Sequence, residues 1–349
     1  YEETQASLVG FSTTYKKNDF TIKPKLYWKR NQDMYVYLRQ DPSVYRNLHI
    51  SNKVGVELNG SKLNSLGNLG LGFDLSKVSL SSNNLGQRNR TMLNMFIEQQ
   101  VKLNNDKIDF TPGIAISYFS DVSTNLNFKD NFFNNLFFYP GADFGYRFNE
   151  NMKLYSNVGY TYRIPTYTDL FYSSPTTIGN ENLKLEKALT KEIGLKYLKN
   201  NFNLNLSLYR RDASDIIDYV RNNESEPWQA NNIREIITDG FELNIGYKFY
   251  LGSLRMHSIN VGYSNINDEL LETNYIFSRY ALNSLKNQIT TTYTFEINDK
   301  IDSTIAFKNS ERLDDEKYTI IDFRTSYKLN KFTLSCLLYT SDAADDCRC

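Results

Sequence analysis

The sequence lacks the features of several common protein classes. No stretch approaches the roughly 18 consecutive apolar residues that a membrane-spanning helix requires, which excludes helical membrane spans. Its 2 histidines, His49 and His257, lie far apart, so no histidine pair suggests a metal site or an acid–base couple. A Gly-rich phosphate loop, a Gly-x-Ser-x-Gly elbow and a paired-cysteine motif are also missing. We therefore expect neither an enzyme nor a protein with a bound metal or cofactor.

Cysteine is absent until residue 336. The 3 cysteines, Cys336, Cys347 and Cys349, all lie at the C-terminal end of the chain. Such an abrupt change in cysteine usage indicates foreign sequence, and residues 336–349 resemble the translated read-through of a sequencing adapter. The alternative is a disulfide or a metal cluster, but three terminal cysteines alone do not supply the partners that either would need. We predict that residues 1–335 form the native domain and that residues 336–349 are a non-native tail.

An excess of charge of either sign is missing too. The 40 Lys and Arg residues cancel the 40 Asp and Glu residues, which argues against a nucleic-acid partner. A mean hydropathy of −0.52 is typical of a soluble protein. A transmembrane β-barrel is also compatible with this value, because only alternate residues of each strand face lipid. The abundance of aromatic residues, 26 Tyr and 22 Phe, is what two membrane-interface girdles would require.

Apolar and polar residues alternate along most of the chain. Between Phe20 and Lys29, apolar side chains occupy the even positions and Lys, Thr or Tyr the odd ones. A period of two predicts a β-strand, and Pro24 within it predicts a bulge. The same pattern marks about sixteen strands, many of them long enough to cross a tilted bilayer. No linker-like segment divides them, so we expect one domain.

Short and long connections between these strands alternate. Asn, Asp and Gly dominate the short connections, as tight hairpins require. The short ones are Lys16–Asp19, Asn64–Asn68, Asn104–Lys107, Asn149–Asn151, Lys199–Asn201, Tyr250–Ser253, Asn298–Lys300 and Leu329–Lys331. The long ones are Val36–Asn47, Ser81–Arg90, Asp121–Asn134, Arg163–Asn182, Arg221–Asn231, Asp268–Ser284 and Asn309–Tyr318. This asymmetry predicts an outer-membrane barrel with short periplasmic turns and longer extracellular loops.

One stretch carries a more specific pattern, in which separated elements follow in a fixed order. Its residues are Arg163, Pro165, Asp169, Leu170, Asn182, Leu183, Glu186, Glu192 and Gly194. The pattern resembles the barrel signature of TonB-dependent outer-membrane receptors, except that Leu185 stands where that family usually has proline. The alternative is a β-hairpin with an incidental long loop in another all-β protein.

The resemblance implies an all-β, antiparallel, up-and-down transmembrane barrel in a bacterial outer membrane. The family's barrel has about 22 strands around an N-terminal plug, so about sixteen strands would make a partial barrel. We therefore expect the plug, the region that contacts the TonB complex, about five upstream strands and the closing strand to lie outside this sequence.

A second, more local resemblance concerns the ligand. Tyr27–Arg30, Arg39–Pro42 and Asn47–His49 resemble segments of the cobalamin-type receptors of Bacteroidetes. This implies import of cobalamin or a related corrinoid. A ferric siderophore, haem or an oligosaccharide is the alternative ligand for the same kind of importer. A passive porin or a surface adhesion barrel is the alternative from another class.

Tyr, Trp, Arg and Asp side chains in the long connections are the candidates for ligand contact. Such groups stack on a large ligand and form several hydrogen bonds with it. The candidates are Tyr37, Arg39, Asp41, Tyr45, Arg46, Tyr167, Asp169, Trp228, Tyr275 and Arg279. Alternatively, they pack against neighbouring loops or bind lipopolysaccharide. Outer-membrane lipid and lipopolysaccharide are expected partners. A surface lipoprotein is a further candidate partner.

Overall fold

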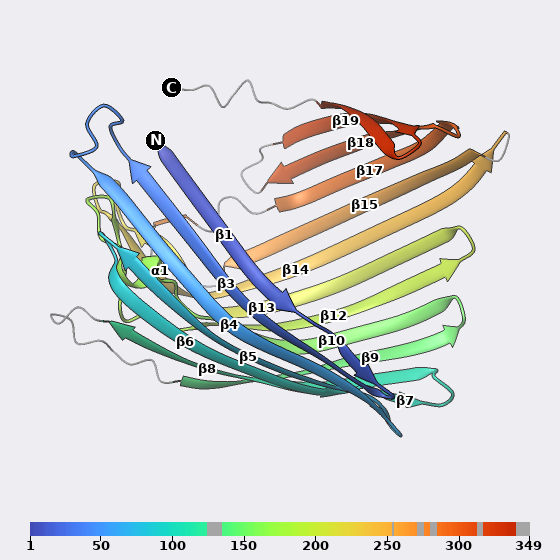
Figure 1. The fold of residues 1–349 in the computed structure, drawn as a ribbon, viewed down its shortest axis with the longest axis horizontal. Coiled ribbons are helices and arrows are strands. Elements are labelled where there is room, and N and C mark those ends of the chain that lie inside the picture. Colours follow the sequence, from blue (N-terminus) through green and yellow to red (C-terminus); the bar gives the residue numbers. More distant parts are fainter. Residues whose placement is uncertain (124–134, 253–254, 271–275, 280–284, 313–316, 340–349) are drawn as a thin grey trace.

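The protein is a strongly curved, almost wholly antiparallel sheet (Figure 1). The computed structural model describes residues 1–123, 135–252, 255–270, 276–279, 285–312 and 317–339. Within them, no helix is long and apolar enough to cross a membrane. The all-β prediction is confirmed.

Within the described residues, the sheet has 20 strands. The longer ones are β1 (Glu2–Ser12), β3 (Phe20–Val36), β4 (Arg46–Asn64), β5 (Gly67–Ser82), β6 (Gly86–Gln99), β8 (Ile108–Ser123), β9 (Asn135–Asn149), β10 (Met152–Arg163), β12 (Glu186–Lys199), β13 (Phe202–Arg221), β14 (Trp228–Leu251), β15 (Arg255–Leu270), β17 (Leu285–Asn298), β18 (Ile301–Arg312), β19 (Lys317–Leu329) and β20 (Phe332–Tyr339). The shorter elements are β2 (Tyr15–Lys17), β7 (Val101–Leu103), β11 (Thr177–Ile178), β16 (Phe277–Ser278) and helix α1 (Tyr167–Phe171).

The topology is up-and-down, because each long strand pairs with the next one along the chain. Strand β2 continues β1 along β3, and β7 continues β6 along β8. The two-residue strands β11 and β16 lie within long connections. The remaining strands number sixteen, as the alternation predicted. In the described part, β1 pairs only with β3 and β20 only with β19, so the sheet is open.

Short turns gather at one rim of the sheet, and α1 with the longer connections lies at the other, which we call the long-loop rim (Figure 1). Asn18, Asn200 and Asn330 have positive φ in the short turns, as tight hairpins demand. One predicted long connection is wrong. Strands β5 and β6 extend to the pair Ser82–Gly86, which leaves only residues 83–85 between them. The polar residues on either side form ladder pairs instead of loop.

The predicted bulge at Pro24 is also wrong. Pro24 pairs with Leu58 of β4 without a register shift. On its other side, Thr13 donates its backbone N–H to the Pro24 carbonyl oxygen at 3.2 Å. Proline cannot return the second bond of that pair. The missing bond coincides with the interruption between β1 and β2, and no extra residue is inserted.

Several predicted segments fall partly or wholly outside the described residues. These are the connections around residues 124–134, 271–275, 280–284 and 313–316, and residues 340–349 of the expected tail. Residues 336–339 of that tail continue β20 and pair with Asp322–Thr325 of β19.

The two faces of the sheet differ in chemistry. One carries large exposed apolar side chains, such as Leu26, Val54, Val158, Ile193 and Leu208, at 45–55% exposure. The other carries polar rows and a recurring cross-strand pair in which a tyrosine ring covers a glycine. The pairs are Tyr27 over Gly55, Tyr155 over Gly194 and Tyr209 over Gly240. A Cβ at any of these glycines would meet the ring at 2.4 Å or less, so only glycine admits it.

We expect this chain, expressed without detergent, to aggregate. Among the described residues, the edges of β1 and β20 are unpaired, and a broad apolar face would lie in water. Light scattering after size-exclusion chromatography measures the outcome, with a detergent-refolded sample as the control. A monodisperse monomer at high concentration in plain buffer would contradict the barrel assignment.

Candidate functional site

Residues 164–185, which join β10 to β12, form an extensively bonded connection at the long-loop rim; we call them the bridging segment. Arg163 ends β10, Glu186 begins β12, and the two residues face each other in the ladder. Two hydrogen bonds of 2.5 Å join the Arg163 guanidinium to the Glu186 carboxylate. Glu186 also accepts the backbone N–H of Ile217 at 2.8 Å, which ties β12 to β13. The pair therefore fixes both ends of the segment.

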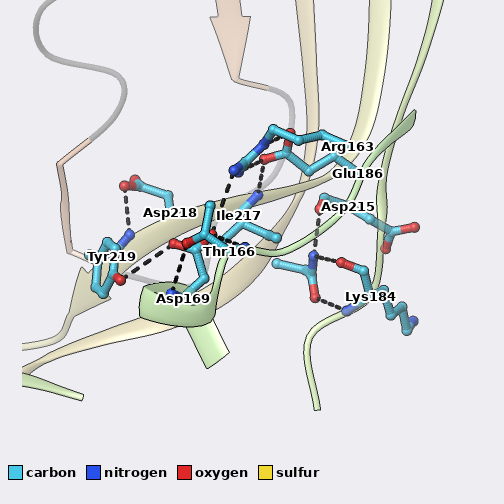
Figure 2. A network of polar contacts seen from close by, with 10 residues as sticks. Arg163, Thr166, Asp169, Lys184, Glu186, Asp215, Ile217, Asp218 and Tyr219 are labelled. Carbon is cyan, nitrogen blue, oxygen red and sulfur yellow. Dashed lines mark hydrogen bonds and ion pairs between the residues drawn. The ribbon is translucent and has the colours of Figure 1, made fainter. Parts of the chain in front are cut away.

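Helix α1 opens the bridging segment with a capping box (Figure 2). The Asp169 backbone N–H donates to Thr166 Oγ1 at 3.1 Å, and the Thr166 N–H donates to Asp169 Oδ2 at 2.9 Å. Arg163 approaches the same Asp169 oxygen at 3.5 Å, and the Tyr219 hydroxyl donates to Asp169 Oδ1 at 3.4 Å. Asp169 is thus buried and fully engaged.

A small apolar cluster lies beneath the segment. Leu170 and Leu183 of the segment pack with Ile217 of β13 and Ala230 of β14, all buried. Asn232 of β14 adds hydrogen bonds to the backbone N–H and carbonyl of Lys184, at 2.8 and 3.2 Å. The signature leucines are therefore core residues of the rim.

The other side of the segment contacts strands far away in the sheet. The Tyr172 hydroxyl lies 3.3 Å from that of Tyr45, just before β4, and Asn47 donates to both hydroxyls. Arg90 of β6 donates to the Pro165 carbonyl at 3.0 Å. One short segment that reaches both β4–β6 and β13–β14 must cross the concave face. The face that bears Arg163, Tyr155 and Gly194 is therefore the lumen, and the apolar face points outwards.

Tyr167 is a largely buried residue of the contact between the bridging segment and β6. The Arg90 guanidinium stacks over its ring at 4.9 Å and pairs with Asp121 through two bonds of 2.6 Å. Burial, and next the nearby Asp121 carboxylate, raise the pKa of the Tyr167 hydroxyl well above its usual range. Burial and then the bond to Tyr45 raise the pKa of Tyr172 as well. Both phenols remain neutral at physiological pH.

A second group of side chains gathers next to the bridging segment; we call it the Trp228 cluster. It consists of Trp228 at the start of β14, Tyr219 and Arg221 at the end of β13, and Phe277 and Arg279 at β16. The Arg221 and Arg279 guanidiniums lie over the Trp228 ring, 4.3 and 4.5 Å from its centroid. Arg221 also stacks on Phe277 and Arg279 on Tyr219, at 5.5 and 5.8 Å. Two of the predicted ligand residues, Trp228 and Arg279, thus meet in space.

The remaining candidates are dispersed. Tyr37, Arg39, Asp41 and Arg46 are exposed around the β3–β4 connection. Arg39 stacks on the Tyr1 ring at 5.0 Å, and Asp41 accepts the backbone N–H of Ser43. Tyr275 lies outside the described residues.

Two further signature residues lie within the barrel wall. Glu192 accepts hydrogen bonds from the Tyr155 hydroxyl at 3.1 Å and from Asn157 at 2.8 Å. Gly194 leaves room for the Tyr155 ring. Leu185, in the position where proline was expected, is buried, whereas Asn182 is exposed. Most of the signature therefore builds the wall and holds the bridging segment on it.

A family model described as TonB dependent receptor-like, beta-barrel, matches residues 2–336. The chain belongs to the TonB-dependent receptor β-barrel family. This family consists of outer-membrane transporters and receptors, which confirms the expected localisation.

Relatives of this receptor barrel differ in what they transport. The vitamin B12 transporter BtuB of Vibrio vulnificus (strain YJ016) is 27% identical over 92 residues, which are 26% of this chain and 14% of that protein. Among solved structures, the FrpB iron transporter of Neisseria meningitidis (F5-1 variant) has a TM-score of 0.76 and 14% identity, over 97% of this chain and 59% of its own. The siderophore receptor PirA of Acinetobacter baumannii has a TM-score of 0.70 and 13% identity, over 94% and 57%.

At such identities these structures establish the fold alone. The chain spans little more than half the length of the solved receptors, and a much smaller share of the vitamin B12 transporter.

The sequence reasoning missed Arg221, Tyr219 and Tyr172. Tyr219 and Arg221 are alternate residues of β13 and share the face of Ile217. Continuing that alternation to the strand end would have placed both side chains in the lumen. Tyr172 carried no such signal, because its partner Tyr45 is 127 positions away.

Replacing Glu186 with Ala should loosen the bridging segment. The change leaves the buried N–H of Ile217 without its acceptor and removes the ion pair with Arg163. We therefore expect the free energy of opening the segment to fall by about 1–3 kcal/mol. Limited proteolysis in detergent, scored for cleavage within residues 164–185, measures this. Glu181→Ala in the same segment is the matched control. Equal cleavage rates for the two variants would refute the anchoring role.

Proposed function

We propose that this chain is part of an active importer that takes up cobalamin or a related corrinoid across the outer membrane. The observation that carries this substrate is the local similarity to a vitamin B12 transporter, since the similar solved structures speak only for the fold. The long-loop rim would face the outside, where ligand arrives, and a TonB complex would supply the energy.

The chemistry of the rim supports a large, amide-rich ligand. The β3–β4 connection presents Tyr37, Arg39, Tyr45 and Arg46, which offer rings for stacking and several hydrogen-bond donors. The adjoining bridging segment is held by polar bonds on both sides, so that it would present a preformed surface to the ligand. Outer-membrane lipid would cover the apolar face, and lipopolysaccharide would surround the rim.

An iron chelate is the second candidate. Two observations favour it: the similar solved structures include receptors named for siderophores and iron, and the Trp228 cluster concentrates positive charge at the lumen mouth. Ferric catecholates are anionic and aromatic, which suits such a cluster.

Equilibrium binding separates the two candidates. The receptor encoded by the whole gene, purified in detergent, should bind cyanocobalamin more tightly than a panel of ferric siderophores. Tight binding of an iron chelate without cobalamin binding would reject the corrinoid and keep the importer. Failure to bind any ligand would count against the importer itself.

Tyr45→Ala or Arg46→Ala should weaken binding of the ligand by about 1–3 kcal/mol, the range for losing a buried polar partner or a hot-spot contact. Insertion of the barrel should be unchanged, because both residues lie at the rim. Lys16→Ala, on the opposite rim, is the control. Wild-type affinity in both rim variants would remove the β3–β4 connection from the ligand site.

A further inference from the structure

Two cations of the Trp228 cluster have no carboxylate partner within the described residues. No ion pair joins Arg221 or Arg279 to an acidic side chain in the part of the chain that the structure describes. Both guanidiniums lie over one indole ring, 4.3 and 4.5 Å from its centroid. The distance between the two guanidiniums therefore cannot exceed the sum of these two distances. Like charges repel at such separations, and the ring faces offset only part of that cost. An anion that both guanidiniums contact would offset it.

Two described acidic residues close in sequence, Asp218 and Glu226, are engaged elsewhere. Asp218 accepts the backbone N–H of Tyr219 and the hydroxyl of Ser278. Glu226 accepts the Asn222 N–H and the Asn223 side-chain amide, at 3.0 and 2.7 Å. Glu224 offers Arg221 only its backbone carbonyl oxygen, at 2.8 Å.

One donor of the cluster is buried and has no partner within the described part of the chain. The Nε of Arg221 is inaccessible to solvent and makes no hydrogen bond among the described residues. A buried donor without an acceptor is costly, and costlier on a charged group. Its neighbour Arg279 remains exposed. The pair thus combines a half-buried inner guanidinium, held by its neighbours, with an outer one that an arriving ligand can reach.

The cluster faces the lumen. Ala230 belongs to the apolar cluster beneath the bridging segment, and Tyr219 packs against it. Arg221 lies two residues after Tyr219 in β13, and Trp228 lies two residues before Ala230 in β14, so each shares the face of its neighbour. Strand β11 of the bridging segment pairs with Trp228, and the Trp228 N–H donates to the Thr176 carbonyl oxygen at 2.9 Å. A molecule that enters the lumen mouth therefore meets this site, whereas a lipid on the outer face does not.

We propose that Arg221, Arg279 and Trp228 form an oxyanion subsite for the imported ligand. Guanidinium forks match phosphate and carboxylate oxygens, and the indole packs against the ring or sugar beside them. The anion's identity rests on the proposed corrinoid import: a corrin ring bears neutral amides, so the phosphodiester of the nucleotide loop is the group that would bind here. Anion binding itself is independent of that assignment.

Two corrinoids test the subsite. Cobinamide lacks the nucleotide loop and its phosphodiester, whereas cobalamin carries both. In the whole receptor, Arg221→Gln and Arg279→Gln should each weaken cyanocobalamin binding about 10–100-fold and leave cobinamide binding within about twofold. Unchanged cobinamide binding shows that the lumen mouth is still folded. Lys317→Gln, at the start of β19, removes a positive charge from the same rim outside the bridging segment and should change neither affinity.

Equal weakening for both corrinoids, or none for either, would overturn the subsite. If the wild type binds neither corrinoid, the proposed function fails and the subsite is decided separately. Inorganic phosphate is then titrated into the receptor, and the change in tryptophan fluorescence is measured. The signal of Trp228 is the part of this fluorescence that is lost in the Trp228→Phe variant. A saturable response that both Gln variants abolish would support the subsite. The absence of a saturable response in the wild type would reject it.

Discussion

The ion pair between Arg163 and Glu186 is the contact on which the long-loop rim depends. It joins the last residue of β10 to the first of β12, and Glu186 passes the constraint to β13 through the Ile217 N–H. Arg163 is partly exposed, so the Coulomb energy of the pair alone is modest. Its value lies in geometry, because it sets where the chain leaves the wall and re-enters it. Asp169 and the capping box then turn the segment across the lumen.

The period of two along each strand connects this rim to the rest of the barrel. The parity that points Arg163 into the lumen also points Tyr155 there, over Gly194. A register slip of one residue would turn the tyrosine rings and charged rows towards lipid and the apolar rows towards water. Several Tyr–Gly pairs set at intervals across the sheet therefore oppose slippage, since each ring fits only where its partner lacks a Cβ.

The wall was predictable from the sequence because alternation and turn chemistry are local. Asn18, Asn200 and Asn330 marked their hairpins, and the strand count followed. Prediction failed where a local signal had two meanings. The polar residues around Asn83 were interpreted as loop but pair across β5 and β6, and Pro24 was accommodated by a strand interruption. The contacts of Tyr172 with Tyr45 and of Trp228 with Arg279 were beyond reach, because the curvature of the sheet decides them.

Four arginines at the rim, Arg90, Arg163, Arg221 and Arg279, divide into two kinds, and this division separates architecture from ligand chemistry. Arg90 and Arg163 are each bound by a carboxylate through two hydrogen bonds, and each anchors the bridging segment. Arg221 and Arg279 have aromatic rings as neighbours but no acidic partner within the described chain. A charge that only supports the wall gains most from a fixed counter-ion. A guanidinium at the lumen mouth that has no fixed counter-ion retains its electrostatic attraction for an anion that enters. The indole beside it limits how far the guanidinium can turn away.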